Sequence, residues 1–189
     1  MNLPNKLTVL RIIMTPLFMA ARVFDCKYHY VVALVLFIVA SFTDMLDGKI
    51  ARAQNLVTDF GKFLDPLADK MLTTAAFVAF LAKDFGIGID WVLFIILFRE
   101  FMVSSLRLVI VSSKEGKVVA ANIWGKAKTV TQMMTIIYGI AIMAVNEIVA
   151  LPLGFMIAFN VLLWLSALFT VVSGVIYLKD GFKYIDSSK

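Results

Sequence analysis

Cysteine and charge are both scarce in this chain of 189 residues. Its single cysteine, Cys26, cannot form an internal disulfide, which excludes a scaffold held together by such bonds. Charged residues make up 16% of the chain, against roughly a quarter in a typical soluble domain, and together with the high apolar fraction of 61% this excludes a disordered chain. The sequence also has no internal repeat and no low-complexity segment.

Apolar residues, in contrast, are abundant. They make up 61% of the chain, and the mean hydropathy is +0.92. A protein of 21.1 kDa cannot hide this much apolar surface in one core, because small domains leave a large share of their surface exposed. The composition therefore excludes an ordinary soluble enzyme and indicates an integral membrane protein.

The net charge is +5, from 18 Lys and Arg against 13 Asp and Glu. In a membrane protein, such an excess is typical of basic loops that face an anionic leaflet. The sequence has no Arg-rich run and no RNA-binding signature, so we expect no nucleic-acid partner.

Six segments are long and apolar enough to be read as membrane-spanning helices, which need about 20 residues each. We therefore expect an all-α integral membrane protein with six transmembrane helices, forming a single domain over residues 1–189. The first segment has no small-residue cleavage site after it, which argues against a signal peptide. The six segments cover residues 7–24, 30–52, 60–81, 91–111, 124–145 and 153–178.

The basic residues predict the orientation of these helices, because cytoplasmic loops carry most of the Lys and Arg. With the N-terminus inside, the outer face holds only Arg22, Lys27 and Lys83. Both termini are therefore expected in the cytoplasm. The inner face then holds Lys6, Arg11, Lys49, Arg52, Lys62, Lys114, Lys117, Lys126, Lys128, Lys179, Lys183 and Lys189.

Acidic residues gather where the second and third segments approach the cytoplasmic face. Charged side chains in spanning helices are costly and usually mark function. Asp44 and Asp47 share one face of the second helix, and Asp65 and Asp69 share one face of the third. A short turn joins the two helices, so we expect them to pack antiparallel, with the four carboxylates converging.

Such a cluster predicts a site for divalent cations, because four ionised carboxylates cannot share a desolvated pocket without neutralisation. Oxygen ligands favour Mg²⁺ or Mn²⁺, and four of them suit two ions that act on a phosphoryl group. Gly48, Ala51 and Gly61 could admit a ligand to the backbone or serve only as helix packing contacts. Arg52 can pair with a phosphate, whereas Asp59 is expected to be a helix cap or a solvated charge.

These residues form a recognisable pattern. The spacing Asp44-x-x-Asp47-Gly48-x-x-Ala51-Arg52, eight residues, Gly61-x-x-x-Asp65-x-x-x-Asp69 resembles the signature of the CDP-alcohol phosphotransferase family at every fixed position. The flanking segments NLPNKLTVLR and DFGKFLDPLADK are similar to those of bacterial members that use sn-glycerol 3-phosphate as acceptor. The resemblance implies transfer of a phosphatidyl group from CDP-diacylglycerol to this acceptor, with release of CMP.

The same resemblance implies roles for individual residues. Asp44, Asp47 and Asp65 would hold the ions, and Asp69 would share in ligation and act as general base. The resemblance also implies a homodimer in a bacterial cytoplasmic membrane, working in phosphatidylglycerol and cardiolipin synthesis. The CDP-binding residues would be Asn5, Thr8, Asp44, Gly48, Arg52 and Gly61.

An acceptor that carries a phosphate needs cations of its own. Arg99 and Arg107 lie eight positions apart on the fourth helix, about 80° apart around its axis and roughly 12 Å along it. With Lys126 and Lys128 they are the candidate residues for binding glycerol 3-phosphate. The alternatives are snorkelling of Arg107, an ion pair of Arg99 with Glu100, and ordinary loop charge for the two lysines.

Two other functions remain open at this point. A member of the same family could use serine, inositol phosphate or phosphatidylglycerol as acceptor. A divalent-cation transporter could also use intramembrane carboxylates, but it would need a path to both faces. Here the acids cluster toward one face and the outer halves of the helices are apolar.

Overall fold

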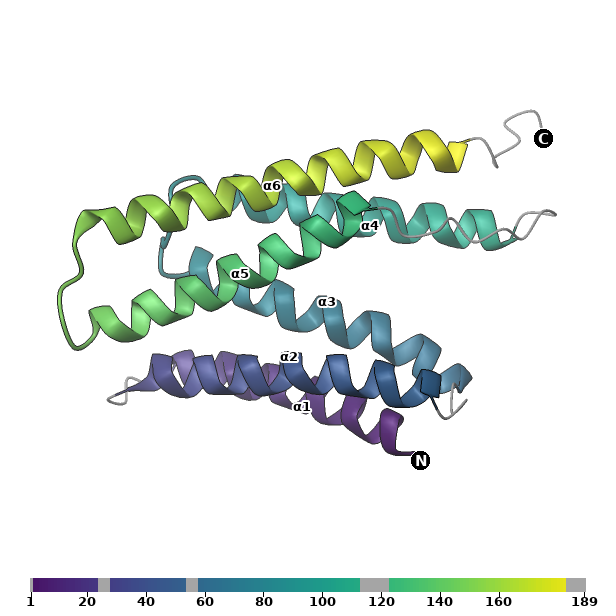
Figure 1. The fold of residues 1–189 in the computed structure, drawn as a ribbon, viewed down its shortest axis with the longest axis horizontal. Coiled ribbons are helices and arrows are strands. Elements are labelled where there is room, and N and C mark those ends of the chain that lie inside the picture. Colours follow the sequence, from purple (N-terminus) through teal and green to yellow (C-terminus); the bar gives the residue numbers. More distant parts are fainter. Residues whose placement is uncertain (1, 24–27, 54–57, 113–122, 183–189) are drawn as a thin grey trace. The chain divides into compact units, whose positions relative to one another are not determined.

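The computed structural model describes residues 2–23, 28–53, 58–112 and 123–182. Six α-helices follow one another along this part of the chain (Figure 1), and it contains no strand. The prediction of an all-α protein with six helices is therefore confirmed. The helices are α1 (Leu3–Val23), α2 (His29–Ala53), α3 (Asp59–Leu81), α4 (Ile89–Ser112), α5 (Ile123–Asn146) and α6 (Leu153–Gly181).

Two of the helices, α5 and α6, are long and apolar enough to cross a membrane, judged by length and composition over the described residues. α2 adds a shorter apolar stretch, His29–Asp44. Charged side chains interrupt the apolar runs of α3 and α4, so composition alone does not mark these two helices as spans. Of the six expected membrane spans, this criterion therefore supports two, α5 and α6.

The surface of α4 nevertheless has the character of a lipid-facing helix. Phe94, Phe98 and Phe101 are 60%, 59% and 69% exposed, although each carries a large apolar ring. The rings of Phe94 and Phe98 stack with their centroids 6.1 Å apart. Exposed aromatic surface of this extent is costly in water and is expected of a surface that contacts lipid or another apolar partner.

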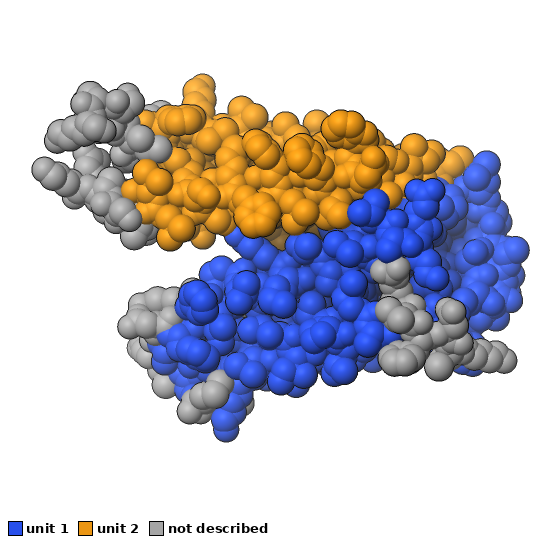
Figure 2. Space-filling model, turned by 180° about the vertical axis from the view of Figure 1, so that it is seen from behind, with its two compact units in different colours: residues 1–85, 136–156 blue, residues 86–135, 157–189 orange. Residues whose placement is uncertain are grey.

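The chain divides into two compact units, coloured separately in Figure 2. Unit 1 comprises residues 1–85 and 136–156, and unit 2 comprises residues 86–135 and 157–189. Each unit is described by itself below. The expected single domain over residues 1–189 stays a prediction.

In unit 1, α1 packs against both α2 and α3, whereas α2 and α3 touch each other only slightly over the described residues. α1 buries an apolar side chain, Phe18, whose ring centroid lies 6.0 Å from that of Phe37 on α2. It also buries polar side chains, which lie on the same helix at Asn5, Thr8, Arg11 and Thr15. Over the described residues, the acidic helices therefore meet α1 more than they meet each other. The expected face-to-face packing of α2 and α3 stays a prediction, because the side chains of residues 45–53 lie outside the described part.

In unit 2, α4 and most of α6 are joined by close contacts at their two ends. The turn before α4 holds Gly86 and Gly88 at φ 113° and 71°, where a side chain would be strained. The Ile87 amide donates to Asn160 Oδ1 at 2.6 Å, and the Trp164 indole donates to the Ile87 carbonyl at 3.0 Å. At the other end, Val103, Leu106, Ile110 and Tyr177 form a buried cluster.

Small and polar residues line the buried face of α6. Thr170, Ser173 and Gly174 are all buried there, and Gly174 lies against Arg99 and Met102 of α4. Gln132 on α5 donates to Thr170 Oγ1 at 3.2 Å. Small residues and side-chain hydrogen bonds are the usual means of helix association in membranes, where lipid is as apolar as the helix surface. The hydrogen bond of Gln132 thus joins α5 to α6.

Candidate active site

The N-terminus of α3 carries the first group of predicted residues. Thr58 caps the helix with extended backbone (φ −110°, ψ 157°), and its Oγ1 accepts from the Gly61 amide at 3.0 Å. Asn5 Nδ2 donates to the same Thr58 oxygen at 2.9 Å. The cap is therefore Thr58 and not Asp59, because the Asp59 position is already helical.

Gly61 is required at this point by close packing. A Cβ atom there would lie 3.0 Å from Asn5 Oδ1 and 3.3 Å from Thr58 Oγ1. A larger residue would push Asn5 away from the start of α3. Asn5 and Gly61, both predicted to bind CDP, are thus brought together by the structure.

Two further contacts run from α1 to the acidic residues. Thr8 Oγ1 donates to Asp65 Oδ1 at 2.8 Å. One turn further along α1, Arg11 forms an ion pair with Asp44 on α2. Arg11 is fully buried, whereas the Asp44 side chain is 45% exposed, so part of this carboxylate remains accessible. One helix thus holds an acid on each of its two neighbours.

The predicted convergence of four carboxylates stays a prediction. No cluster of three or more His, Cys, Asp and Glu side chains suited to a metal occurs among the residues that the structure describes. Asp65 and Asp69 lie one turn apart on α3, and both are exposed. Asp47, Gly48 and Arg52 belong to α2, but their side chains lie outside the described part.

The donor chemistry of these residues nevertheless fits a hard divalent cation. The described acids offer only carboxylate oxygens, the ligands that Mg²⁺ and Mn²⁺ prefer. Asp44 already takes a cationic partner, the Arg11 guanidinium, and its side chain remains about half exposed. An ion and its substrate could therefore reach Asp44 without disturbing the helix.

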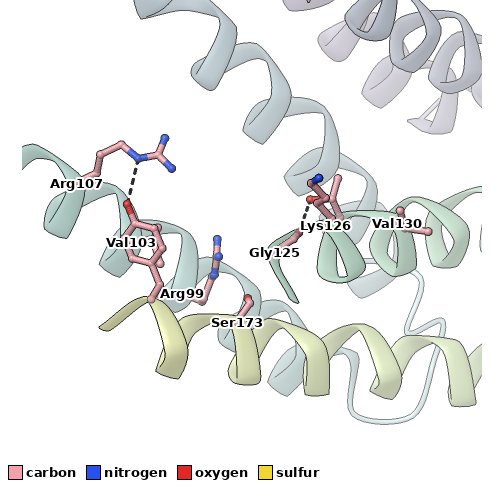
Figure 3. A pocket seen from close by; sticks show the side chains of 9 residues that line it. Arg99, Val103, Arg107, Gly125, Lys126, Val130 and Ser173 are labelled. Carbon is pink, nitrogen blue, oxygen red and sulfur yellow. Dashed lines mark hydrogen bonds between the residues drawn. The ribbon is translucent and has the colours of Figure 1, made fainter. Parts of the chain in front are cut away.

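Unit 2 contains a pocket of about 540 Å³ that gathers three of the four cations predicted to bind the acceptor. Arg99 and Arg107 extend from α4, and Lys126 extends from the first turn of α5 (Figure 3). Arg107 Nε also lies 3.5 Å from the Tyr177 hydroxyl of α6. The full set of lining residues is Arg99, Val103, Arg107, Gly125, Lys126, Thr129, Val130, Ser173 and Tyr177.

Lys128, the fourth predicted cation, does not line this pocket. It is 8% exposed and forms an ion pair with Glu100 of α4. Lys126 and Lys128 are two positions apart on a helix, so their side chains leave it in different directions. Glu100 also accepts from Arg99 Nη1 at 3.1 Å, so the predicted ion pair between Arg99 and Glu100 is present alongside the pocket.

Several residues at these sites were not evident from the sequence. Arg11 reads as a basic residue of the inner face, yet it is buried in α1 and paired with Asp44. Arg11 follows Thr8 by three positions, which places both residues on one side of a helix, and this spacing could have indicated that Arg11 belongs to the site. Ser173 and Tyr177 give no such signal, because hydroxyl groups are common on helices that pack in membranes.

Comparison with known proteins now identifies the class of protein. A model of the family described as CDP-alcohol phosphatidyltransferase matches residues 1–172. The chain belongs to this family, which confirms the resemblance seen in the motif. Together with the two long apolar helices, membership of the family indicates a membrane protein.

Individual relatives carry a more specific name. A Bacillus subtilis protein named CDP-diacylglycerol–glycerol-3-phosphate 3-phosphatidyltransferase is 39% identical, over 99% of this chain and 98% of its own length. A Rickettsia felis protein of the same name is 36% identical over 97% of both chains. A Haemophilus influenzae protein, also of that name, is 33% identical over 94% of this chain and 92% of its own.

Proposed function

We propose that the protein transfers the phosphatidyl group of CDP-diacylglycerol to sn-glycerol 3-phosphate, forming phosphatidylglycerophosphate and CMP. This reaction serves phosphatidylglycerol and cardiolipin synthesis. The observation that carries the choice of acceptor is the pocket lined by Arg99, Arg107 and Lys126. The family motif and the shared name of three relatives support the same reaction.

The pocket suits an acceptor that carries its own phosphate. Its volume of about 540 Å³ lies in the range of small-molecule sites. A phosphate monoester carries close to two negative charges, which two guanidinium groups and one ammonium group can neutralise. Lys126 and Arg107 are exposed, so they can meet a substrate that arrives from water. Serine offers no phosphate that would use these three cations.

In the reaction, a hydroxyl oxygen of the acceptor forms a new bond to the β-phosphorus of CDP-diacylglycerol. The anhydride bond from that phosphorus to CMP breaks, and CMP leaves with the bonding electrons. Asp69 takes the hydroxyl proton, because an alcohol is a poor nucleophile until its proton is removed. Asp69 is exposed on α3, one turn beyond Asp65.

The acids Asp44, Asp47, Asp65 and Asp69 would hold two Mg²⁺ or Mn²⁺ ions. Members of this family are generally dependent on divalent metal ions. When bound, such ions offset the charge of the pyrophosphate and of the departing CMP. Arg11 and Thr8 orient the two described ligands of this set, Asp44 and Asp65, by direct contact.

The nucleotide side of the site would be formed by residues of unit 1. Asn5 and Thr58 present polar groups beside Gly61 at the start of α3, where the helix dipole favours anionic groups. Thr8 and Asp44 adjoin them through their contacts with α3 and α1. Gly48 and Arg52 complete the CDP-binding set by their positions in the family motif.

The cellular setting follows from the substrates. The acyl chains of CDP-diacylglycerol can stay in the bilayer while its headgroup enters the site. We place the protein in a bacterial cytoplasmic membrane, crossing it several times, with both termini and the active site facing the cytoplasm. We also propose that it works as a homodimer.

Testing the acceptor directly separates this function from its alternatives. The purified protein, CDP-diacylglycerol and Mg²⁺ are incubated with sn-glycerol 3-phosphate, serine, inositol phosphate or phosphatidylglycerol, and CMP release is measured. We expect release only with glycerol 3-phosphate. Release with another acceptor alone would replace the proposed reaction. Nucleotide-independent uptake of divalent cations into proteoliposomes would instead support a transporter.

A further inference from the structure

Glu100 joins two of the cations expected around the acceptor. Its Oε1 accepts from Arg99 Nη1 at 3.1 Å and also forms an ion pair with Lys128 Nζ. The side chains of Glu100, Arg99 and Lys128 are only 17%, 14% and 10% exposed. In such a poorly solvated setting, a carboxylate shared by two cations is held firmly by both.

The contact with Arg99 determines which edge of its guanidinium group faces a ligand. Nη1 is occupied by Glu100. Nε is buried and has no hydrogen-bond partner among the described residues. Nε and Nη2 carry parallel N–H bonds, the arrangement that binds two oxygens of one phosphate. Fixing Nη1 therefore reserves this edge for an oxyanion in the pocket that Arg99 lines.

The stem of Arg99 is held from the opposite direction by α6. A Cβ atom on Gly174 would lie 3.0 Å from Arg99 Cγ and 3.3 Å from Met102 Cε. The glycine thus lets the arginine lie directly against the α6 backbone. With Gly174 behind its stem and Glu100 at its tip, Arg99 is fixed at two points, which limits the entropy lost when a ligand binds.

The second contact of Glu100 removes Lys128 from the pocket. Lys128 lies two positions after Lys126, which does line the pocket. Pairing with Glu100 neutralises Lys128, leaving Arg99, Arg107 and Lys126 as the cations of the lining. The Glu100 carboxylate therefore determines both how many cations line the pocket and how the guanidinium group of Arg99 is oriented.

We propose that Glu100 is a positioning residue for the acceptor phosphate: it orients Arg99 toward the phosphate and keeps Lys128 out of the pocket. This inference rests on the proposed function, because it names the acceptor phosphate as the ligand. A purely structural role would be different. Glu100 would then only neutralise the buried Lys128, and its loss would matter for folding but not for the acceptor.

The experiment compares Lys128→Met with the double variant Glu100→Gln/Lys128→Met, both in the full-length protein. Because Lys128 is removed in both variants, loss of Glu100 leaves no buried ammonium group without a counter-ion. The comparison therefore measures the effect of Glu100 on acceptor binding alone. We expect the double variant to have a KM for glycerol 3-phosphate roughly tenfold above that of Lys128→Met, since Arg99 loses a charge-assisted contact. KM for CDP-diacylglycerol should change little. Equal KM values for the acceptor would overturn the proposal.

A control variant and a second substitution complete the test. Asp90→Asn removes an exposed acid from the first turn of the same helix and should leave both KM values unchanged. Made in the Lys128→Met background, Glu100→Asp keeps the negative charge but shortens the side chain and withdraws the carboxylate from Arg99, so it should also raise KM for the acceptor. It replaces the double variant if that protein does not fold, and an unchanged KM would again overturn the proposal.

Binding of inorganic phosphate separates this inference from the proposed reaction. Calorimetric titration of the detergent-solubilised protein needs no turnover. We expect roughly tenfold weaker phosphate binding in the double variant than in Lys128→Met. If that loss occurs while glycerol 3-phosphate supports no turnover in the parent, the role of Glu100 stands and the proposed acceptor is wrong. If turnover is normal but phosphate binding is equal in the two variants, only the role of Glu100 is wrong.

Discussion

The Thr8 hydroxyl donates a 2.8 Å hydrogen bond to Asp65 Oδ1, joining α1 to α3 across 57 positions of sequence. The same hydroxyl lies 3.1 Å from the carbonyl oxygen of Pro4, one turn earlier in α1. Thr8 is almost fully buried, so water does not compete for either contact. Asp65 is exposed and would otherwise be free to change rotamer. The bond therefore fixes one carboxylate of the family motif.

Thr8→Val should impair turnover while preserving the fold. Valine keeps the β-branched shape but cannot donate to Asp65, and a hydrogen bond to a charged group stabilises by about 1.5–3 kcal/mol. We expect a higher Mg²⁺ concentration for half-maximal activity, measured as CMP release during a metal titration. Thr15→Val is the matched control, because Thr15 is also buried in α1 but bonds to the Arg11 carbonyl. An equal shift in both variants would assign the effect to α1 packing.

Arg11→Met should lower both thermal stability and activity. Methionine fills part of the buried space but removes the cation paired with Asp44. The remaining carboxylate is about half exposed, so we expect a loss of roughly 1–3 kcal/mol rather than the larger cost of stranding a fully buried charge. Thermal unfolding in detergent measures the first effect and CMP release the second. Unchanged activity would show that Asp44 needs no orienting partner.

Removal of divalent metal should abolish turnover. EDTA is expected to stop CMP release, and excess Mg²⁺ or Mn²⁺ should restore it. Asp44→Asn, Asp47→Asn and Asp65→Asn should each reduce activity severely and leave a folded membrane protein, because each removes one charge from the proposed ligand set. Circular dichroism checks the fold. Full activity of the parent in metal-free buffer would contradict the two-ion proposal.

Asp69→Asn should damage the chemical step more than substrate binding. The amide keeps the shape of the side chain and one oxygen but cannot accept a proton. Loss of a general base typically lowers the rate by 10²–10⁴-fold. The measurement is turnover at saturating Mg²⁺, alongside direct binding of CDP-diacylglycerol. If the variant regains near-parent turnover at a high Mg²⁺ concentration, Asp69 acts only as a metal ligand and another group removes the proton.

Arg107→Ala should raise KM for glycerol 3-phosphate by roughly tenfold or more, with a much smaller effect on CDP-diacylglycerol. Arg107 lines the pocket from α4 and is positioned by Tyr177, so its guanidinium group faces the proposed phosphate. Arg107→Lys keeps the charge but loses the planar guanidinium group, so its KM for glycerol 3-phosphate should lie between the values of the parent and of Arg107→Ala. Steady-state kinetics with each substrate varied in turn gives both values. Equal increases for the two substrates would point to a structural role.

The sequence predicted the helices well because long apolar runs directly determine them. All six expected segments are helical, with ends close to those expected, for example 124–145 against Ile123–Asn146 for α5. The structure pairs Asn5 with Gly61 and Thr8 with Asp65. Asn5 and Thr8 were expected at the nucleotide site from the family resemblance, and these pairings were not predicted.

The sequence could not predict which helix packs against a given helix face. Periodicity shows which residues share a face but not which helix covers it, so the contacts of α1 with both acidic helices were not predicted. The same limit applies to Lys126 and Lys128. Their spacing shows that they diverge, but only the position of Glu100 on α4 shows which one is neutralised.

The pocket of unit 2 is lined from α4, α5 and α6, whereas the family motif lies on α2 and α3 of unit 1. With the acceptor in this pocket, as proposed, substitutions that alter acceptor choice and substitutions that harm the nucleotide chemistry would fall in different units. A duplicated gene could therefore keep its motif under purifying selection while Arg99, Arg107 and Lys126 drift toward another alcohol. New lipid headgroups would then arise through a few changes near one pocket, while the catalytic motif is kept.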